Sequence, residues 1–328
     1  MSAPVRKAGD VATGEYDVSV VIPTFRRPHL LRRSLEAVQA QSLWLTRGGE
    51  ILVVDNCPNR SAEPVVAALP VGDVPVRYLA EPRPGISHAR NSGVSTTKGG
   101  LIVFIDDDNL TVETAIGDLV AALEETNASA AFGRYIALPE AACPPNSLHF
   151  IGPYSRDLGA TRRDVTRERA KLGTCLSLFR RSALAKREQL FDPALGLTGG
   201  EDSALLRELA QEGHRFVYEP SAVGFEIVAL SRLNRASLQR RRFRSGQIRV
   251  ADAGGMAQRA LWRGIGAVQF VLHAQMAAVA GLLGQRRRAE FHRGQAWGGL
   301  GKLFWRRPQP PFYGDDPLRK DVDAKAAS

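Results

Sequence analysis

The chain has 328 residues, which is long enough for one large α/β domain or two smaller ones with a substantial core. Its hydrophobic content of 44% and charged content of 24% are ordinary for a globular protein. The formal net charge of +10 is not ordinary, and it indicates an anionic partner such as a nucleotide, a membrane surface or a nucleic acid. Three scattered cysteines exclude a disulfide framework and a CxxC zinc site, and they fit a reducing compartment.

Three regions are expected along the chain. Residues 1–15 are polar and lack an apolar core, so they predict a disordered lead-in rather than a secretory signal. Residues 16–250 carry the strand and helix patterns of an α/β domain. Residues 251–328 predict a C-terminal helical extension.

Strand and helix patterns alternate through the first 125 residues, which predicts βαβ units and a mostly parallel sheet. Short β-branched and apolar runs predict the strands, and apolar residues at helical spacing predict the helices between them. The expected strands are 18–23, 50–56, 76–79 and 101–105, and the expected helices are 28–38, 63–69, 86–94 and 112–125.

The fourth strand runs directly into three carboxylates, Asp106, Asp107 and Asp108. Adjacent acids repel one another, so a divalent cation carrying a phosphate is the natural partner for them. The alternative is a solvated acidic turn after a core strand. Strand alternation predicts that Asp107 points to the opposite face and stays out of a metal site.

Two other strands also end in polar side chains, at Thr24 and Asp55. Parallel strands of a βαβ sheet end on one edge. These residues should therefore lie beside Asp106–Asp108, the acid run, where open α/β sheets bind ligands. Each has a local alternative. Asp55 can initiate a turn, and Thr24 can cap the helix that Pro28 begins.

The second half is less regular. Strands are expected at 130–136, 174–179, 215–220 and 223–228. The long irregular segment 139–171 is typical of a functional lid or an open loop. Glu201 and Asp202 begin a helix after two glycines, where acids either complement the helix dipole or present a general base to a cleft. Seven arginines between Arg232 and Arg249 suit nucleic acid, phospholipid or a diphosphate, or form a solvated helix face.

Six short segments form an ordered set along residues 16–249. They are Val-Ile-Pro-Thr-Phe-Arg-Arg at 21–27, Val-Val-Asp-Asn at 53–56, Pro-Gly-Ile-Ser-His-Ala-Arg-Asn-Ser-Gly at 84–93, Phe-Ile-Asp-Asp-Asp at 104–108, Gly-Glu-Asp at 200–202 and Gln-x-x-Arg-Phe at 239–243. Each motif alone is a weak indication of a family, but the six motifs in this order are a specific one. It resembles the motifs of the family 2 glycosyltransferases, inverting enzymes with the GT-A nucleotide-sugar-binding fold.

The resemblance implies a nucleotide-diphosphate sugar donor, a UDP sugar in the first place, and Mg²⁺ or Mn²⁺ as cofactor. It implies transfer to a hydroxyl of a glycan or lipid-linked acceptor, as in bacterial polysaccharide or cell-surface glycan synthesis. Asp202 would be the catalytic base. Asp108 would ligate the metal, together with Asp106 on the ribose side of the nucleotide. The remaining donor contacts would come from Pro23, Thr24, Phe25, Arg27, Asp55, Arg90, Gln239 and Arg242.

The proposed chemistry requires these residue types. Negative charge develops on the leaving diphosphate, and a hard cation on carboxylates stabilises it, with arginine donors sharing the task. The base must lie across the sugar from the leaving group, hence on a separate segment. Because an ordinary carboxylate is a weak base, Asp202 should lie in a cleft that partly desolvates it.

Two positions depart from the family pattern. Glu226 stands near the place where many members have a histidine that is sometimes a metal ligand, and it is either an oxygen ligand or a structural acid. Phe243 replaces the tryptophan of the Gln-x-x-Arg-Trp box, which argues against a processive enzyme resembling cellulose synthases.

The C-terminal tail alternates apolar stretches with arginines and aromatic residues. Residues 261–283 are apolar but diluted by glycine, alanine and Gln269, so they fall short of a clear spanning helix. Arg286, Arg287 and Arg288 follow, and then Trp297 and Trp305. The pattern predicts peripheral docking at the cytoplasmic face of the plasma membrane, with a buried helical hairpin as the alternative.

Two other functions compete with sugar transfer. A non-catalytic basic adaptor would use the arginine-rich helix to bind a membrane or nucleic acid, but it would not need Asp106, Asp108 and Asp202 together. A nucleotidyltransferase would need a glycine-rich phosphate cradle after the first strand, which the chain lacks. We therefore expect an enzyme that does not bind nucleic acid.

Overall fold

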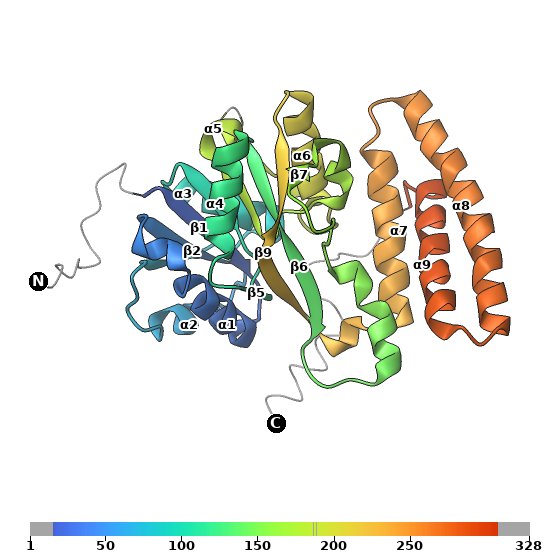
Figure 1. Ribbon diagram of the computed structural model, residues 1–328, viewed down its shortest axis with the longest axis horizontal. Helices are drawn as coiled ribbons and strands as arrows, with labels where there is room; N and C mark the ends of the chain where they lie inside the picture. The colour runs from blue at the N-terminus through green and yellow to red at the C-terminus, as the bar shows by residue number, and fades with distance from the viewer. Residues whose placement is uncertain (1–15, 186, 188, 308–328) are drawn as a thin grey trace, which may run out of the picture.

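The computed structural model describes residues 16–185, 187 and 189–307. The lead-in predicted for residues 1–15 lies outside this range, as do residues 308–328 of the predicted extension. The described chain forms a nine-stranded sheet in which eight strands follow the order β3-β2-β1-β4-β8-β6-β9-β5 and β7 pairs with β9. Three long C-terminal helices stand beside the sheet (Figure 1).

The first half of the sheet is parallel, as predicted. Its strands are β1 (Val18–Thr24), β2 (Gly49–Asp55), β3 (Val76–Ala80) and β4 (Leu101–Phe104). β1 and β2 are buried along their whole length, which is why their sequences are almost continuously apolar. The connecting helices are α1 (Pro28–Gln39), α2 (Glu63–Ala67) and α3 (Ile86–Thr96).

The second half of the sheet mixes directions. After β5 (Asn109–Thr111) and α4 (Ala115–Thr126), β6 (Ala130–Pro139) runs parallel to β9 (Phe216–Val228), while β8 (Ser177–Arg180) is antiparallel to β4 and β6. β5 and β7 (Arg163–Asp164) are antiparallel to β9. The prediction of two strands at 215–220 and 223–228 was wrong, since β9 is continuous. A register shift opposite Gly133 accommodates Pro220.

Short elements fill the rest of the second half. The segment predicted as an irregular loop, 139–171, contains 3₁₀ turns at 145–150, 152–154 and 166–171. Further 3₁₀ turns lie at 193–195 and 230–232, and one in the first half of the chain lies at 42–45. The helices here are α5 (Arg181–Leu184) and α6 (Glu201–Gln211).

Two large apolar clusters form most of the core, and a small third cluster lies around Tyr154 and Val228. One joins alternate residues of β1 and β2 to Leu31 and Leu35 of α1 and to α4. The other contains a chain of phenylalanines in edge-to-face contact, Phe104, Phe132, Phe179 and Phe191, with ring centroids 5.6–5.9 Å apart. Burial of large aromatic side chains in such pairs contributes strongly to stability.

The helices of the extension are α7 (Arg235–Ala251), α8 (Met256–Leu282) and α9 (Arg286–Leu303). α9 lies between α7 and α8, and α8 is outermost (Figure 1). Glycines permit this close packing: Gly301 meets the Phe243 backbone of α7, and a Cβ on Gly266 of α8 would lie 2.8 Å from the Gly299 carbonyl of α9. α8 is the one helix of the described chain long and apolar enough to cross a membrane, and 17% of its apolar window is buried.

Two glycines of α8 provide a matched test of this packing. A Cβ on Gly266 would lie 2.6 Å from Lys302 Cβ and 2.8 Å from the Gly299 carbonyl, whereas Gly264 has nothing within 4 Å. We expect Gly266→Ala to lower the free energy of unfolding by about 1–3 kcal/mol through overpacking. Gly264→Ala should raise it by about 0.5–1 kcal/mol, because alanine favours the helix. Urea unfolding measures both changes, and equal effects would contradict the observed packing.

Candidate active site

The predicted polar edge of the sheet is present. β2, β1 and β4 are neighbours, and Thr24 and Asp55 pair directly in the register of β1 and β2. β4 ends at Phe104, and Asp106–Asp108 form the turn that leads into β5. The three strand ends therefore gather at one edge, as the parallel topology requires.

Asp107 shows where the argument from strand alternation was wrong. Because the strand ends at Phe104, alternation does not reach this residue. Its carboxylate is buried and accepts hydrogen bonds from Thr24 Oγ1 at 2.8 Å and from Arg27 Nη1 at 3.0 Å. Burial raises the pKa of Asp107 to about 6, although Arg27 opposes the rise.

Arg27 ties two of the acids together. Its Nη1 donates to Asp108 Oδ2 at 2.6 Å as well as to Asp107. Burial alone would lower the pKa of Arg27, but the two carboxylates outweigh it and raise that pKa. The side chain predicted to contact the donor is thus already bonded to the acid run.

Arg90 connects the acid run to the second acidic segment. Its Nη1 donates to Glu201 Oε1 at 2.7 Å and its Nη2 to Asp106 Oδ1 at 3.4 Å. Arg90 is 3% exposed and Glu201 is 2% exposed, and the guanidinium lies over the Phe191 ring. Burial raises the pKa of Glu201 to about 7, with the charge of Asp202 adding to the rise and Arg90 opposing it.

The two acids at the start of α6 differ in burial and in their partners. Glu201 is buried against Arg90, whereas Asp202 remains partly exposed and its Oδ1 accepts a hydrogen bond from Ser203 N at 2.7 Å. Gly199 and Gly200 approach the helix with φ of 80° and 104°, a backbone that favours glycine. Arg244 of α7 donates to the carbonyls of Thr198 and Gly199, which fixes this turn.

Glu226 lies at the other side of the acid run. It pairs with Asn109 across β5 and β9, and the next backbone amide, Ile227 N, donates to the Asp108 carbonyl at 2.8 Å. Burial raises the pKa of Glu226 to about 8, and the charge of Asp108 adds to it, while Arg241 and Arg232 oppose it. Burial likewise raises the pKa of Asp106, against the effect of Arg90.

The side chains at this edge of the sheet are suitable ligands for a hard divalent cation. Asp106, Asp108 and Glu226 offer carboxylate oxygens, the ligands that Mg²⁺ and Mn²⁺ prefer. Within residues 16–185, 187 and 189–307, no three His, Cys, Asp or Glu side chains already stand close enough together to hold a metal. Burial raises the pKa of Asp106 and of Glu226, and the charge of Asp108 adds to both, so a bound cation would favour their ionised forms.

Asp55 is engaged locally. It is fully buried, and its oxygens accept hydrogen bonds from Cys57 N at 2.9 Å, Ala62 N at 2.7 Å and Tyr78 OH at 3.3 Å. These contacts match the turn-forming alternative. Its contact with a nucleoside base stays a prediction, as does that of Pro23 and of the partly buried Phe25, whose ring lies 5.0 Å from the Arg26 guanidinium.

On α7, the charge of Arg241, a residue that the family motif does not single out, acts on Glu226. Arg241 stacks on Tyr154 and opposes the pKa rise of Glu226. Gln239 and Arg242 are partly buried, and no contact described in the structure links either side chain to the acid run. A run of three arginines at 240–242 does not reveal which one faces inward, so sequence reasoning missed Arg241.

Sequence reasoning also missed Arg156. This side chain is 3% exposed and donates to the carbonyls of Gly133, Gly173, Cys175 and Leu176 at 2.7–2.8 Å. It thereby holds a bent segment in which Leu176 has a φ of 47°. The charge of Asp106 is among the causes that raise the pKa of Cys175, so this segment lies against the acid run.

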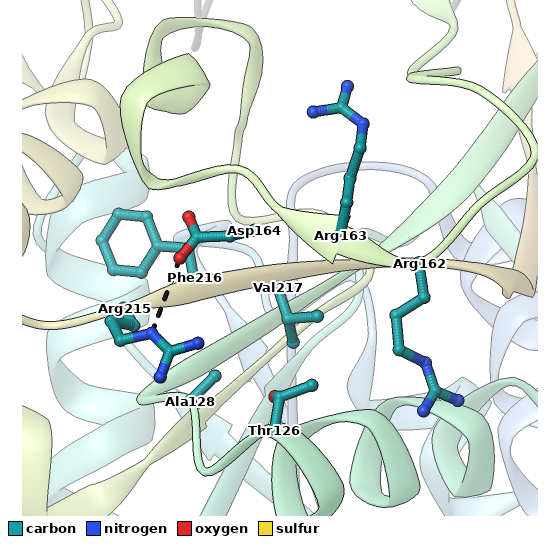
Figure 2. Close-up of a pocket in the computed structure, with 8 residues that line it drawn as sticks. All are labelled: Thr126, Ala128, Arg162, Arg163, Asp164, Arg215, Phe216 and Val217. Carbon is teal, nitrogen blue, oxygen red and sulfur yellow. Dashed lines mark ion pairs between the residues drawn. The ribbon is translucent and has the colours of Figure 1, made fainter.

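A small pocket elsewhere is a poor alternative site. It has a volume of about 100 Å³ and lies around the start of β9, lined by Arg162, Arg163, Arg215, Asp164 and four other residues (Figure 2). Arg215 and Asp164 form an ion pair there, as Figure 2 shows. Ligand pockets usually measure about 300–1,000 Å³, and none of the predicted site residues lines this one.

The sequence matches one family model and a bacterial relative. Residues 19–187 match the family model described as glycosyl transferase family 2. The chain is 30% identical over 234 residues to the succinoglycan biosynthesis protein ExoM of Rhizobium meliloti (strain 1021), which covers 70% of this chain and 73% of that protein.

Two solved structures show the same fold. A mannosyltransferase from Pyrobaculum calidifontis, PcManGT, in complex with GDP-Man and Mn²⁺, superposes with a TM-score of 0.57 at 20% identity, covering 92% of each chain. S. aureus TarS in complex with UDP superposes with a TM-score of 0.54 at 15% identity, covering 86% of this chain and 90% of that chain.

Replacing Arg90 should reveal the bridge between the two acidic segments. Below about pH 6, Glu201 is protonated, because its pKa is about 7 in the folded state against an ordinary value of 4.5. The ion pair with Arg90 therefore contributes stability mainly above pH 7. We expect Arg90→Met to lower the free energy of unfolding by about 3–5 kcal/mol near pH 8.5 and by much less near pH 5.5.

Urea unfolding at the two pH values measures this difference. Arg32→Met, at an exposed position of α1, is the matched control and should change the stability little at either pH. A pH-independent loss in Arg90→Met would show that the bridge does not depend on the charge of Glu201.

Proposed function

The chain belongs to glycosyl transferase family 2, and we propose that it transfers one sugar, with inversion, from a UDP sugar to a hydroxyl of a glycan or lipid-linked glycan. The prediction of an enzyme is confirmed by this membership, and the predicted GT-A fold is confirmed by the structural neighbours. The donor, the acceptor and the stereochemistry belong to the proposal.

One observation supports this proposal above all: Arg90 bonds to both acidic segments, at Glu201 and at Asp106, and the two segments remain separate. The acid run at the end of β4 is suited to the leaving diphosphate, while Asp202 extends from a separate helix. Inverting transfer needs this separation, because the base and the leaving group act on opposite faces of the sugar.

We assign the base to Asp202. Its carboxylate takes the proton of the acceptor hydroxyl as that oxygen forms a bond to the anomeric carbon, and the bond from this carbon to the diphosphate oxygen breaks with its electron pair. The turn that carries Asp202 is held by Arg244, and its neighbour Glu201 is held by Arg90. Such anchoring keeps the base within reach of the acceptor, since small misplacements are costly in rate.

Asp106 and Asp108 would hold the divalent cation, with Glu226 as a third ligand. When bound, the cation supplies positive charge at the leaving diphosphate. The Mn²⁺ bound to PcManGT together with GDP-Man supports the assignment. Around it, Arg27 is placed to move from Asp108 to a phosphate oxygen, because both are anionic acceptors.

The rest of the donor site is proposed from the family motif. Pro23, Thr24, Phe25 and Asp55 lie at the end of β1 and β2, beside the acid run, which suits the nucleoside. Gln239 and Arg242 of α7 are assigned to the diphosphate. The UDP bound to TarS supports a uridine nucleotide, and the place of ExoM in succinoglycan biosynthesis supports a glycan acceptor.

Asp202→Asn tests the assignment of the base. Removing a general base lowers kcat by about 10²–10⁴-fold, so we expect such a loss with little change in the melting temperature. The control is Asp118→Asn, which changes an acid in the first turn of α4. Sugar transfer monitored by release of the nucleoside diphosphate measures kcat, and unchanged transfer in Asp202→Asn would overturn the assignment.

The cation site is tested by thermal unfolding. A saturating concentration of Mn²⁺ should raise the melting temperature by about 2–5 °C, because it binds the native state, and Asp108→Ala should abolish the increase. Glu226 keeps its proton below about pH 8, so its participation would make the increase grow from about pH 6 to pH 8.

Glu226→Gln then decides the role of this acid. If Glu226 is a ligand, the variant should lose most of the pH dependence of the Mn²⁺ effect. If the variant shows the same pH dependence and the same increase as the wild type, Glu226 is a structural acid.

A further inference from the structure

The outer face of α8 is apolar and exposed. Nine large apolar side chains along it have exposed fractions between 39% and 89%, and many follow the three- and four-residue spacing of one helix face. Together they form the α8 stripe: Leu261, Ile265, Val268, Val271, Leu272, Met276, Val279, Leu282 and Leu283. Contiguous exposed apolar surface of this kind marks an interaction site.

The surroundings of the α8 stripe are strongly basic. Between residues 256 and 307 there are nine lysines and arginines and a single acid, Glu290, which is buried and paired with Arg235 and Arg293. α8 itself contains no acid. The partner of this face must therefore be both apolar and anionic.

The basic residues lie at both ends of the stripe. At one end, a groove of about 690 Å³ is lined by Arg259, Arg263, Arg306 and Arg307, with Met256, Phe304 and Trp305 among the other lining residues. Arg259 and Arg306 both lie over the Trp305 ring, at 5.2 and 4.8 Å from its centroid. At the other end, Arg286, Arg287 and Arg288 are exposed. Arginine beside tryptophan is typical of the interfacial region of a bilayer.

We propose that the α8–α9 hairpin docks flat on an anionic lipid leaflet. The α8 stripe enters the boundary between headgroups and acyl chains, while the arginines of both ends bind lipid phosphates. The docking itself is independent of the transfer reaction. Presentation of a lipid-linked acceptor to Asp202 at this surface rests on the proposed function.

The inner side of α8 explains why the helix lies on the membrane instead of crossing it. Gly266, Ala277 and Ala280 are buried. Gln269 Nε2 donates to the Gln295 carbonyl of α9 at 2.9 Å, and His273 contacts His292 at 2.9 Å. A spanning helix would have to break these contacts and separate from α9 along its length.

Vesicle co-sedimentation of the full chain tests the proposal. We expect binding to phosphatidylglycerol-containing vesicles at least tenfold tighter than to pure phosphatidylcholine vesicles, and release by high salt. Two variants should each weaken binding at least tenfold: Leu261→Ser/Val268→Ser/Leu272→Ser in the stripe, and Arg259→Gln/Arg263→Gln/Arg306→Gln/Arg307→Gln in the groove. Arg32→Gln/Arg33→Gln on α1 removes two exposed charges away from the hairpin as a control, to be compared with the pair Arg306→Gln/Arg307→Gln, and should bind like the wild type.

Four results would overturn the proposal: no vesicle binding, equal binding to neutral vesicles, resistance to both salt and carbonate extraction, or a concentration-dependent dimer that covers the stripe, measured by light scattering. The altered side chains lie at the surface or along the groove, so the variants should keep the wild-type melting temperature. They should also transfer sugar to a water-soluble acceptor at the wild-type rate. Failed docking is thereby distinguished from failure of the transfer reaction.

Discussion

The buried guanidinium of Arg90 is the constraint on which the site depends. It comes from α3, and it bonds Glu201 of α6 and Asp106 after β4, two acids that are 95 positions apart in the sequence. A buried charge of this kind is costly unless it is paired, so the three elements are held in one arrangement. Asp202, the next residue of α6, stays partly exposed beside this buried pair.

Around this bridge the edge of the sheet gathers buried acids, and its arginines offset only part of the cost of ionising them. Arg27 binds Asp107 and Asp108, and Arg241 lies near Glu226, but burial still raises the pKa of Asp107, Glu226 and Asp106. Unbalanced acids of this kind favour a cation and, with it, a diphosphate. The cost of ionising these buried acids is thus what a bound cation would offset.

The helix α7 connects the catalytic edge with the C-terminal hairpin. One side carries Arg241, whose charge acts on Glu226, and Arg244, which bonds the turn before Asp202. The other side packs against α9 through glycines, with Gly246 close to the Gly298 carbonyl. If the hairpin docks on a leaflet, α7 sets the distance and direction of the site relative to the lipid surface.

Local sequence patterns determined the parallel half of the sheet, the shared edge of Thr24, Asp55 and the acid run, and the family. They could do so because buried strands, turn residues and short motifs depend on neighbours along the chain. Only the tertiary structure decided that Asp107 turns inward to Thr24 and Arg27, that the charge of Arg241 acts on Glu226, and that Arg156 holds the segment beside the acid run. These are pairings between residues far apart in the sequence. No propensity or periodicity encodes them, because burial and charge select partners only when the chain has folded.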